Sequence, residues 1–235
     1  PLYFDQPFAD PTLLPSLLLS RFAREEVTVA LSGDGGDELF FGYSQQRALL
    51  GLRHLRMLPR SLRTAAFEAL RHVTGVLPGN RFQQAGKLLE ILQFGSEAEL
   101  FQYFVGTIGP ARLDRVADLL VDPVDIKDAW FSPILAQLKN DAPRLPVEER
   151  ISQMFMRTFL VDTVLAKTDR AGMAYGLEAR VPFLDDEMVA LSASIPFSLK
   201  LKGGSSKYIL RRLLAQKLRK GNLSTTQSQR PKQGF

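Results

Sequence analysis

Cysteine is absent from the 235 residues of this chain, and histidine occurs only as His54 and His72. The absence of cysteine excludes disulfides, cysteine-ligated zinc, iron–sulfur clusters and a cysteine nucleophile within the chain. With two histidines, both among Arg and Leu, we expect no histidine metal site and no Ser–His catalytic pair. Long apolar runs are also missing, since the best candidate, 13–19, is interrupted by Pro15 and Ser16. We therefore expect no membrane span and no signal peptide, and we expect a cytoplasmic protein.

Acidic residues are absent from the last 36 positions, 200–235, which hold ten Lys or Arg. Residues 1–199 then hold 20 basic and 25 acidic residues, so the net charge of +5 conceals a strong asymmetry. A basic block of this kind is typical of a solvated face or of a site for a polyanion, either a nucleic acid or a nucleoside triphosphate. Because only Tyr208 and Phe235 are aromatic in the block, we expect no nucleic-acid partner.

The first 43 residues show the pattern of an α/β unit. Asp10 and Pro11 suit the cap and first position of a helix over 11–25. The run 27–31 is β-branched and apolar, which predicts a buried strand. It ends in SGDGGDE (32–38), where three glycines in seven residues impose a tight loop. Ligands in such folds bind beyond the carboxyl ends of the strands.

Helical periodicity dominates after this loop. The predicted helices, separated by Pro and Gly, are 44–56, 61–74, 80–93, 97–106, 133–140, 147–160, 186–194 and 206–219. Residues 221–235 are predicted to form an irregular tail. One strand cannot form a sheet, so we expect the chain to be a piece of a longer protein.

The SGDGGDE loop carries two aspartates, Asp34 and Asp37, three positions apart. Glycines let the backbone approach a ligand, and successive N–H groups can bind anionic oxygens. A helical turn after the loop would bring both carboxylates to one side, where they would suit Mg²⁺ held with nucleotide phosphates. The same residues also fit a strand-to-helix turn in which Asp caps the helix. The loop by itself does not separate these interpretations.

Two further segments carry clustered charge. KGGSSK (202–207) lacks the spacing of a Walker loop and follows no predicted strand, so we do not expect it to bind phosphate in that way. The segment 167–186, KTDRAGMAYGLEARVPFLDD, alternates charges among apolar residues. This pattern predicts partly buried ion pairs with a structural role.

Four motifs in this order resemble the glutamine-dependent asparagine synthetases. They are SGDGGDELFFGY (32–43), KTDRAGMAYGLEARVPFLD (167–185), SSKYILRR (205–212) and RPKQGF (230–235). The similarity is to the C-terminal, ATP-using synthetase domain of that family and runs from about Tyr3 to Phe235. It implies that this largely helical chain is the C-terminal part of a parallel-sheet α/β domain of the pyrophosphatase type, like the adenine nucleotide alpha hydrolases. Within it, the resemblance implies an α/β nucleotide-site portion over 1–43, a helical portion over 44–220 and a basic tail with a site lysine over 221–235.

The resemblance also implies a reaction. The family's synthetase domain is a ligase of asparagine biosynthesis that converts aspartate, ATP and ammonia into asparagine, AMP and pyrophosphate through a β-aspartyl-adenylate. The implied cofactors are ATP and Mg²⁺. The ammonia would come from glutamine through an N-terminal glutaminase domain in the full-length protein, and the resemblance allows a homodimer.

Individual site residues are implied by position within the motifs. Ser32 and Gly33 match the pair that contacts the AMP part of ATP. Asp34 matches the acidic residue linked to forming the acyl-adenylate, and Asp37 matches an aspartate that binds Mg²⁺. Lys232 matches the lysine that stabilises the adenylation transition state and pyrophosphate. Because negative charge grows on the leaving pyrophosphate, a metal ion and a lysine are the stabilisers that the chemistry needs.

The chain also departs from the family's pattern. The pyrophosphate loop SGG-x-DS and the glutaminase cysteine do not occur in the sequence, and Phe41 stands where the family usually has Gly. We therefore expect the isolated chain to be inactive. Two alternatives stay open: a related amidotransferase or β-lactam-synthetase-like enzyme that adenylates another carboxylate, and a non-catalytic homologue. The presence of Asp34, Asp37 and Lys232 favours an enzyme.

Overall fold

The computed structural model describes residues 3–5, 8–52, 58–59, 61–63, 65, 97–106, 133–141 and 145–221. The predicted helix 80–93, most of 61–74, the tail from 222 and Lys232 lie outside the described residues. The chain divides into two compact units, one formed by residues 1–43 with 155–235 and the other by residues 44–154. The three portions inferred from the resemblance stay a prediction.

The unit formed by residues 44–154 is helical in its described part. Its described helices are α3 (Ser44–Leu52), α6 (Glu97–Val105), α9 (Pro133–Asp141) and α10 (Val147–Met154). α6 packs on α3, α9 and α10, and α10 also packs on α3 and α9. The core consists of side chains that are at most 1% exposed: Leu49, Leu100, Phe101, Leu135 and Ile151. The helices predicted over 44–56, 97–106 and 133–140 are confirmed within a few residues.

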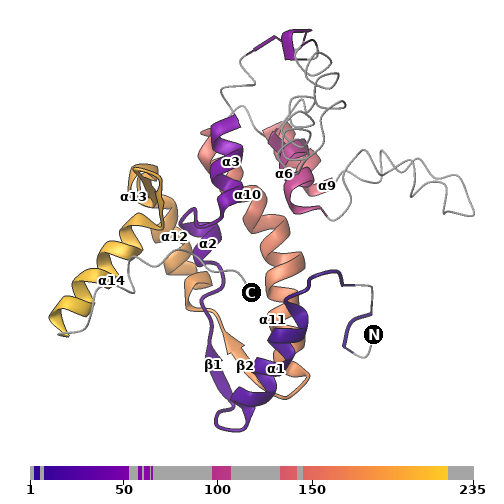
Figure 1. Ribbon diagram of the computed structural model, residues 1–235, viewed down its shortest axis with the longest axis vertical. Helices are drawn as coiled ribbons and strands as arrows, with labels where there is room; N and C mark the ends of the chain where they lie inside the picture. The colour runs from indigo at the N-terminus through magenta and orange to yellow at the C-terminus, as the bar shows by residue number, and fades with distance from the viewer. Residues whose placement is uncertain are drawn as a thin grey trace, which may run out of the picture. The chain divides into compact units, whose positions relative to one another are not determined.

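The other unit contains a short parallel sheet with helices packed on it (Figure 1). The N-terminal elements are α1 (Leu13–Arg24), β1 (Val29–Leu31) and α2 (Gly36–Leu39). The same unit also contains the π-helix η4 (Phe155–Leu165), α11 (Ala166–Met173) and β2 (Glu178–Arg180), which come later in the sequence. β1 pairs with β2 in parallel, with Val29 opposite Glu178 and Leu31 opposite Arg180. α1 packs on α11, and α11 packs on β2 and η4.

The prediction of a single strand was wrong, because β2 lies inside the charged segment 167–186. Glu178 and Arg180 are both exposed, and β2 has only three residues, so it carries no apolar alternation that would mark a strand. Its strand conformation comes from pairing with β1. The helix predicted over 147–160 is also longer than expected, since α10, η4 and α11 follow one another as far as Met173.

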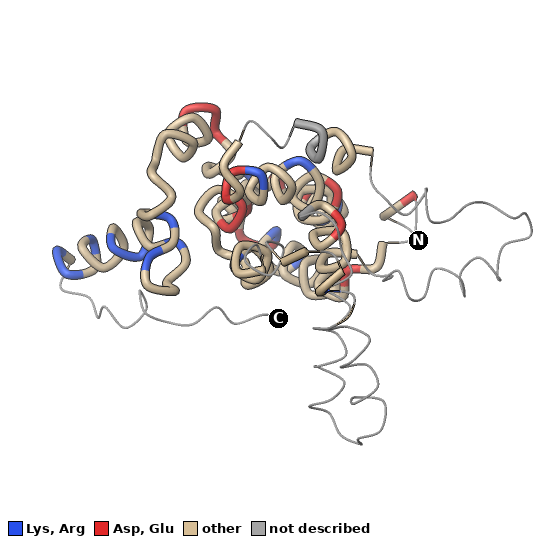
Figure 2. The backbone as a smooth tube through the Cα atoms, turned by 90° about the horizontal axis from the view of Figure 1, so that it is seen from above, with Lys and Arg blue, Asp and Glu red and all other residues tan. Residues whose placement is uncertain are grey.

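The C-terminal part of this unit contains short elements and one longer helix. They are η5 (Pro182–Leu184), α12 (Asp186–Ser194), α13 (Phe197–Lys200), β3 (Leu201–Lys202), β4 (Ser205–Ser206) and α14 (Tyr208–Lys220). Asp185 caps α12, because its Oδ1 accepts from the Glu187 amide at 3.0 Å. Lys and Arg concentrate on α14 (Figure 2). The predicted helices 186–194 and 206–219 are thus confirmed.

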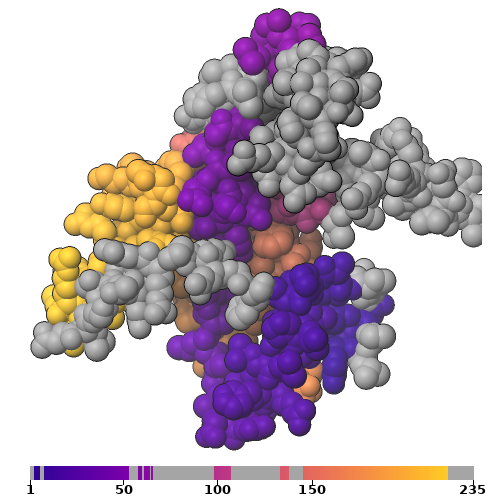
Figure 3. Space-filling model, viewed as in Figure 1, coloured from indigo at the N-terminus to yellow at the C-terminus, as the bar shows by residue number. Residues whose placement is uncertain are grey.

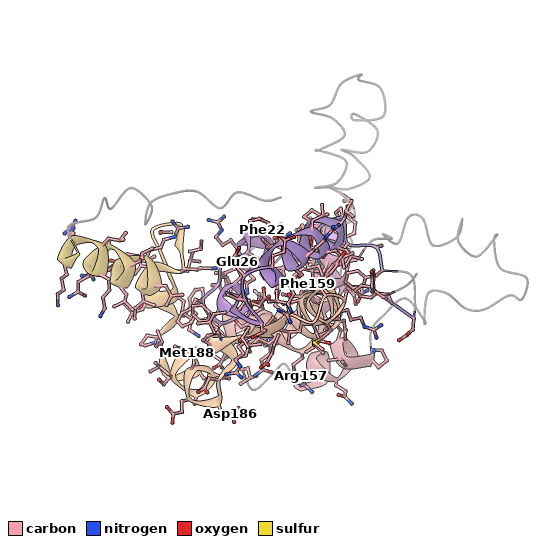
Figure 4. The ribbon with its side chains drawn as sticks, turned by 90° about the horizontal axis from the view of Figure 1, so that it is seen from below. Phe22, Glu26, Arg157, Phe159, Asp186 and Met188 are labelled. Atoms are coloured by element: carbon pink, nitrogen blue, oxygen red, sulfur yellow. The ribbon has the colours of Figure 1, made fainter. Side chains whose placement is uncertain are left out.

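Aromatic contacts fix the end of the glycine-rich motif within this unit. Phe41 is fully buried and meets Phe197 edge to face at 4.8 Å between ring centroids. Tyr43 stacks on Phe155 at 5.2 Å and meets Phe159 of η4, which Figure 4 labels, at 5.6 Å. Buried aromatic rings stabilise a fold through the apolar area that they remove from water and through their preferred contact geometry. These contacts therefore hold the segment 40–43 in place directly after the glycine loop.

Several large apolar side chains are exposed on α1 and β1, which belong to the indigo part of the chain in Figure 3. Leu14, Leu18 and Phe22 are 64%, 58% and 68% exposed, and Val29 and Leu31 of β1 are 37% and 74% exposed. The prediction of a buried strand was therefore wrong: in the described part of the chain β1 pairs with β2 alone, which leaves these side chains uncovered. Among the described residues, none of the helices has the length and apolar character needed to cross a membrane.

Candidate functional site

The glycine loop 32–37 follows β1 at the carboxyl edge of the parallel sheet. The Ser32 amide donates to the Arg180 carbonyl oxygen at 2.8 Å, so the loop begins where the pairing of β1 with β2 ends. Gly35 has φ +81°, and a Cβ there would meet the Leu184 side chain of η5. Glycine is thus required by backbone conformation and by close packing. The loop occupies the position where ligands bind in parallel α/β folds.

Asp34 is held by two hydroxyl groups from different segments. Ser32 Oγ donates to Asp34 Oδ2 at 3.0 Å, and Thr168 Oγ1 of α11 donates to the same oxygen at 2.9 Å. The Asp34 amide donates to Ser32 Oγ at 3.4 Å. The loop of the first motif and the helix of the second therefore meet at the Asp34 carboxylate.

Asp37 lies in the first turn of α2 and forms an ion pair with Lys207, 3.0 Å between Oδ1 and Nζ. The two side chains are 20% and 29% exposed, so the pair is partly shielded from water. Lys207 precedes α14 in the left-handed conformation, with φ +51°, and its amide donates to the Phe40 carbonyl oxygen at 3.2 Å. The third motif therefore reaches the same loop.

Glu38 adds a buried carboxyl group beside the two aspartates. It is 1% exposed, and its Oε1 accepts from the Tyr43 hydroxyl at 2.7 Å. Burial raises the pKa of Glu38, and the charges of Asp37 and Asp34 act in the same direction. Burial and the charge of Glu38 raise the pKa of Tyr43, which keeps its proton. Tyr43 is thus a fixed donor that compensates part of the cost of burying a carboxylate.

The helix α11 is attached to the start of α1 by a partly buried ion pair. Lys167 Nζ lies 2.8 Å from Asp10 Oδ2, with side chains 15% and 16% exposed, and it also donates to Thr12 Oγ1. This confirms the prediction of partly buried ion pairs in the segment 167–186. The prediction was wrong for Arg170 and Arg180, which pair at the surface with Asp5 at 3.1 Å and with Glu178 at 2.8 Å.

The predicted residues divide into those that the structure connects and those that it does not describe. Ser32, Asp34 and Asp37 lie in one loop and contact α11 or the start of α14. Gly33 is exposed, and its Cβ position is open. Lys232 lies outside the described residues. Asp34 precedes α2, so the two aspartates do not share the helical turn that their spacing predicted.

Sequence reasoning missed two residues of this site, Thr168 and Lys207. Thr168 belongs to a segment interpreted as structural ion pairs, and Lys207 ends KGGSSK, which was considered only as a Walker loop. Lys207 also lies within SSKYILRR, so its place in a shared motif was a signal. Nothing in the spacing indicated that either side chain would contact Asp34 or Asp37.

Metal binding at the loop would need ligands beyond its own carboxylates. The described residues contain no group of three or more His, Cys, Asp or Glu side chains that could hold a metal ion by themselves. Mg²⁺ is usually held by one or two carboxylates together with substrate phosphates and water. Asp37 lies beside the Lys207 ammonium group and after the glycine loop. It therefore fits a site in which phosphates and water complete the coordination of Mg²⁺, and it does not fit a site in which the protein supplies every ligand.

The fold and site define a mostly helical α/β protein with a small parallel sheet and an acidic glycine loop at its carboxyl edge. The family model described as asparagine synthase matches residues 1–235, and the chain belongs to this family. The resemblance drawn from the four motifs is therefore confirmed.

Individual relatives agree. The chain is 33% identical over 214 residues to the putative asparagine synthetase (glutamine-hydrolyzing) of Mycobacterium tuberculosis strain H37Rv, covering 90% of this chain and 31% of that protein. It is 32% identical over 212 residues to asparagine synthetase (glutamine-hydrolyzing) 1 of Bacillus subtilis, covering 89% of this chain and 31% of the relative. The chain thus spans about a third of the length of these relatives. No solved structure gives a significant match.

Proposed function

We propose that this chain forms part of the adenylating site of an ATP-dependent amide ligase. The enzyme would convert aspartate, ATP and ammonia into asparagine, AMP and pyrophosphate through a β-aspartyl-adenylate. Ammonia would be supplied from glutamine by a glutaminase domain elsewhere in the full-length protein. The parallel pair β1–β2 would belong to a larger sheet of the pyrophosphatase type.

The observation that carries the proposal is the meeting of three motifs around one loop. Asp34 accepts from Thr168 of α11, and Asp37 pairs with Lys207 at the start of α14. These contacts join segments more than 130 residues apart. A solvated charged surface has no need for such convergence, whereas a site that holds phosphates requires both glycine N–H groups and paired charges near them.

Four residues of the loop have proposed tasks. Ser32 and Gly33 would contact the AMP part of ATP, and the exposed, open Gly33 allows close approach of a ligand. Asp34 would act in forming the acyl-adenylate. Asp37 would hold Mg²⁺ that is shared with the phosphates, and Lys207 beside it keeps a positive charge at that carboxylate.

Attack of the aspartate carboxylate on the α-phosphorus forms a carboxyl–phosphorus anhydride and expels pyrophosphate. When bound, Mg²⁺ would neutralise charge on the polyphosphate. Lys232 is proposed to stabilise the negative charge on the leaving pyrophosphate. The ten basic residues of 200–235 suit a polyphosphate in this region of the enzyme.

The test compares two half-reactions in the full-length polypeptide that carries this chain. Pyrophosphate release is measured with ATP and aspartate, and glutamate release is measured with glutamine alone. We expect Asp37→Ala and Lys232→Ala each to lower pyrophosphate release about 10²- to 10³-fold, which corresponds to roughly 3–4 kcal/mol. Glutamine hydrolysis should be largely unchanged, because neither residue takes part in it. Lys232→Arg should restore little, because a planar guanidinium presents its charge differently.

Matched controls are Asp186→Ala and Arg21→Ala, which remove an exposed acid and an exposed base of the same unit. Both should keep normal pyrophosphate release. Release without dependence on aspartate would assign the enzyme to another carboxylate. Near-normal release by Lys232→Ala would show that the family's role does not transfer to RPKQGF.

A further inference from the structure

Thr168 has no role in the assignments above, yet its hydroxyl is directed to a proposed site carboxylate. A threonine within a helix commonly returns its single hydroxyl proton to the carbonyl oxygen three or four residues earlier. Thr168 lies in the first turn of α11 and donates instead to Asp34 Oδ2 at 2.9 Å. Asp34 and Thr168 are 134 positions apart in the sequence, so this contact is purely tertiary.

Both hydroxyl donors act on one oxygen of Asp34. Ser32 Oγ and Thr168 Oγ1 donate to Oδ2. Within the described part of the chain, no hydrogen bond is made to Oδ1 of Asp34. Two donors on one oxygen restrict rotation of the carboxylate and leave the other oxygen as an acceptor for a substrate group.

We infer that Thr168 is a positioning residue that holds the Asp34 carboxylate in one orientation during adenylation. The inference rests on the proposed function, since it assigns a supporting residue to the same site. It follows from a competition at Ser32, whose hydroxyl has one proton. When Ser32 Oγ donates its proton to the nucleotide, it no longer donates a hydrogen bond to Asp34. Thr168 is then the remaining hydroxyl donor to Oδ2.

Thr168 is well placed to act as a rigid anchor. α11 packs on α1 and on β2, and the adjacent Lys167 is held by Asp10 and Thr12. Preorganised groups of this kind contribute to rate because they need no rearrangement as the reaction proceeds. The inference therefore predicts an effect on the chemical step that is larger than the effect on ATP binding.

The test uses Thr168→Val, which keeps the branched shape and removes the donor, and Thr168→Ser, which keeps the donor. In the full-length enzyme, Thr168→Val should lower kcat for aspartate-dependent pyrophosphate release about three- to tenfold, with KM for ATP changed by less than about twofold. Thr168→Ser should keep most of the wild-type kcat. Thr28→Val is the matched control, because it removes the hydroxyl of an exposed threonine of the same unit, and it should leave kcat unchanged.

A wild-type kcat for Thr168→Val would overturn the inference. So would equal losses in Thr168→Ser and Thr168→Val, which would indicate a packing role, or an equal loss in Thr28→Val, which would show that the effect is not specific to Thr168. An enzyme that releases no pyrophosphate would overturn the proposed function. In that case, crystal structures of the 235-residue chain test independently whether Thr168 orients the Asp34 carboxylate. There we expect more than one orientation of the Asp34 carboxylate in Thr168→Val and one orientation in Thr168→Ser; a single, unchanged orientation in Thr168→Val would contradict the positioning role.

Discussion

Gly42 leaves the space that the Asp37 carboxylate occupies. A Cβ at this position would meet Asp37 Oδ1 and the Lys207 side chain. The Gly42 amide also donates to the Asp37 carbonyl oxygen at 2.8 Å. This hydrogen bond holds the backbone of residue 42 close to Asp37, so the backbone cannot easily move to make room for a Cβ. At this residue, the requirement for glycine comes from a neighbouring charged side chain and not from a positive φ.

We predict that Gly42→Ala displaces the Asp37 carboxylate and weakens its pairing with Lys207. Pyrophosphate release by the full-length enzyme should fall by about 10²-fold, comparable to the loss of one transition-state contact. Gly51→Ala is the control, because nothing lies within 4 Å of its Cβ position in α3. That change should leave activity intact and stabilise the helix by about 0.5–1 kcal/mol. Equal activity in both variants would show that Asp37 tolerates displacement.

Phe41 has a strained backbone conformation, and the packing of its ring compensates for that strain. It has φ +59°, a left-handed conformation that glycine adopts freely and other residues adopt at about 1–2 kcal/mol. Its ring is fully buried and packs edge to face on Phe197. Aromatic burial of this kind offsets the strain, so Phe can stand where the family usually has Gly.

At the scale of elements, the joint between α1 and α11 determines where Thr168 and Asp34 meet. Asp10 Oδ1 accepts from the Thr12 amide at 2.8 Å just before α1 begins, and its other oxygen pairs with Lys167. Burial acts to raise the pKa of Asp10, but the hydrogen bonds from Lys167 and Thr12 outweigh it, so the pKa is lowered. The charged form of Asp10 therefore stabilises the fold.

This lowered pKa predicts a pH dependence of stability. A carboxyl group whose pKa falls on folding stabilises the protein above its unfolded pKa of about 4, and that stabilisation is lost as the pH drops through the lower folded value. In a double-mutant cycle with Asp10→Asn and Lys167→Met, we expect a coupling energy of about 1–2 kcal/mol at pH 7. The coupling should shrink on acidification below pH 4.

Denaturant unfolding of the four proteins at pH 7 and at about pH 3 measures this coupling. The exposed pair of Arg180 with Glu178 provides a control, since surface pairs contribute little and are screened by salt. Coupling that stays constant between the two pH values would contradict the role of the Asp10 charge.

At the scale of the whole molecule, the proposed polyphosphate site would need groups beyond the acidic loop of this chain. The SGG-x-DS loop is absent from the sequence, and the chain spans about a third of its curated relatives. Rate acceleration in phosphoryl chemistry depends mostly on complete positioning and charge stabilisation.

We therefore predict that the purified 235-residue chain neither makes asparagine nor exchanges pyrophosphate into ATP. Its exchange rate should lie several orders of magnitude below that of the full-length enzyme, because part of the phosphate site is missing. Radiolabelled pyrophosphate exchange with ATP and aspartate measures both proteins under the same conditions. Robust exchange by the chain alone would show that its own residues suffice.

Local sequence signals predicted much of the fold in this protein. Pro and Gly delimited the helices, and the apolar run before SGDGGDE marked β1. α1 begins at Leu13, two residues after the start that Asp10 and Pro11 predicted, with Thr12 as its N-cap. These features succeed because capping, helical periodicity and tight turns depend on residues a few positions apart. β2 was not predicted, because a three-residue strand with two charged side chains takes its conformation from its partner.

The candidate site divides in the same way. By itself, the sequence determined the family, the glycine loop and the aspartates within it, because these are properties of short motifs and their order. Only the tertiary structure decided that Thr168 donates to Asp34, that Lys207 pairs with Asp37 and that Gly42 makes room for that pair. The physical reason is that hydrogen bonds and ion pairs act over about 3 Å, whereas the residues they join lie up to 170 positions apart in the chain.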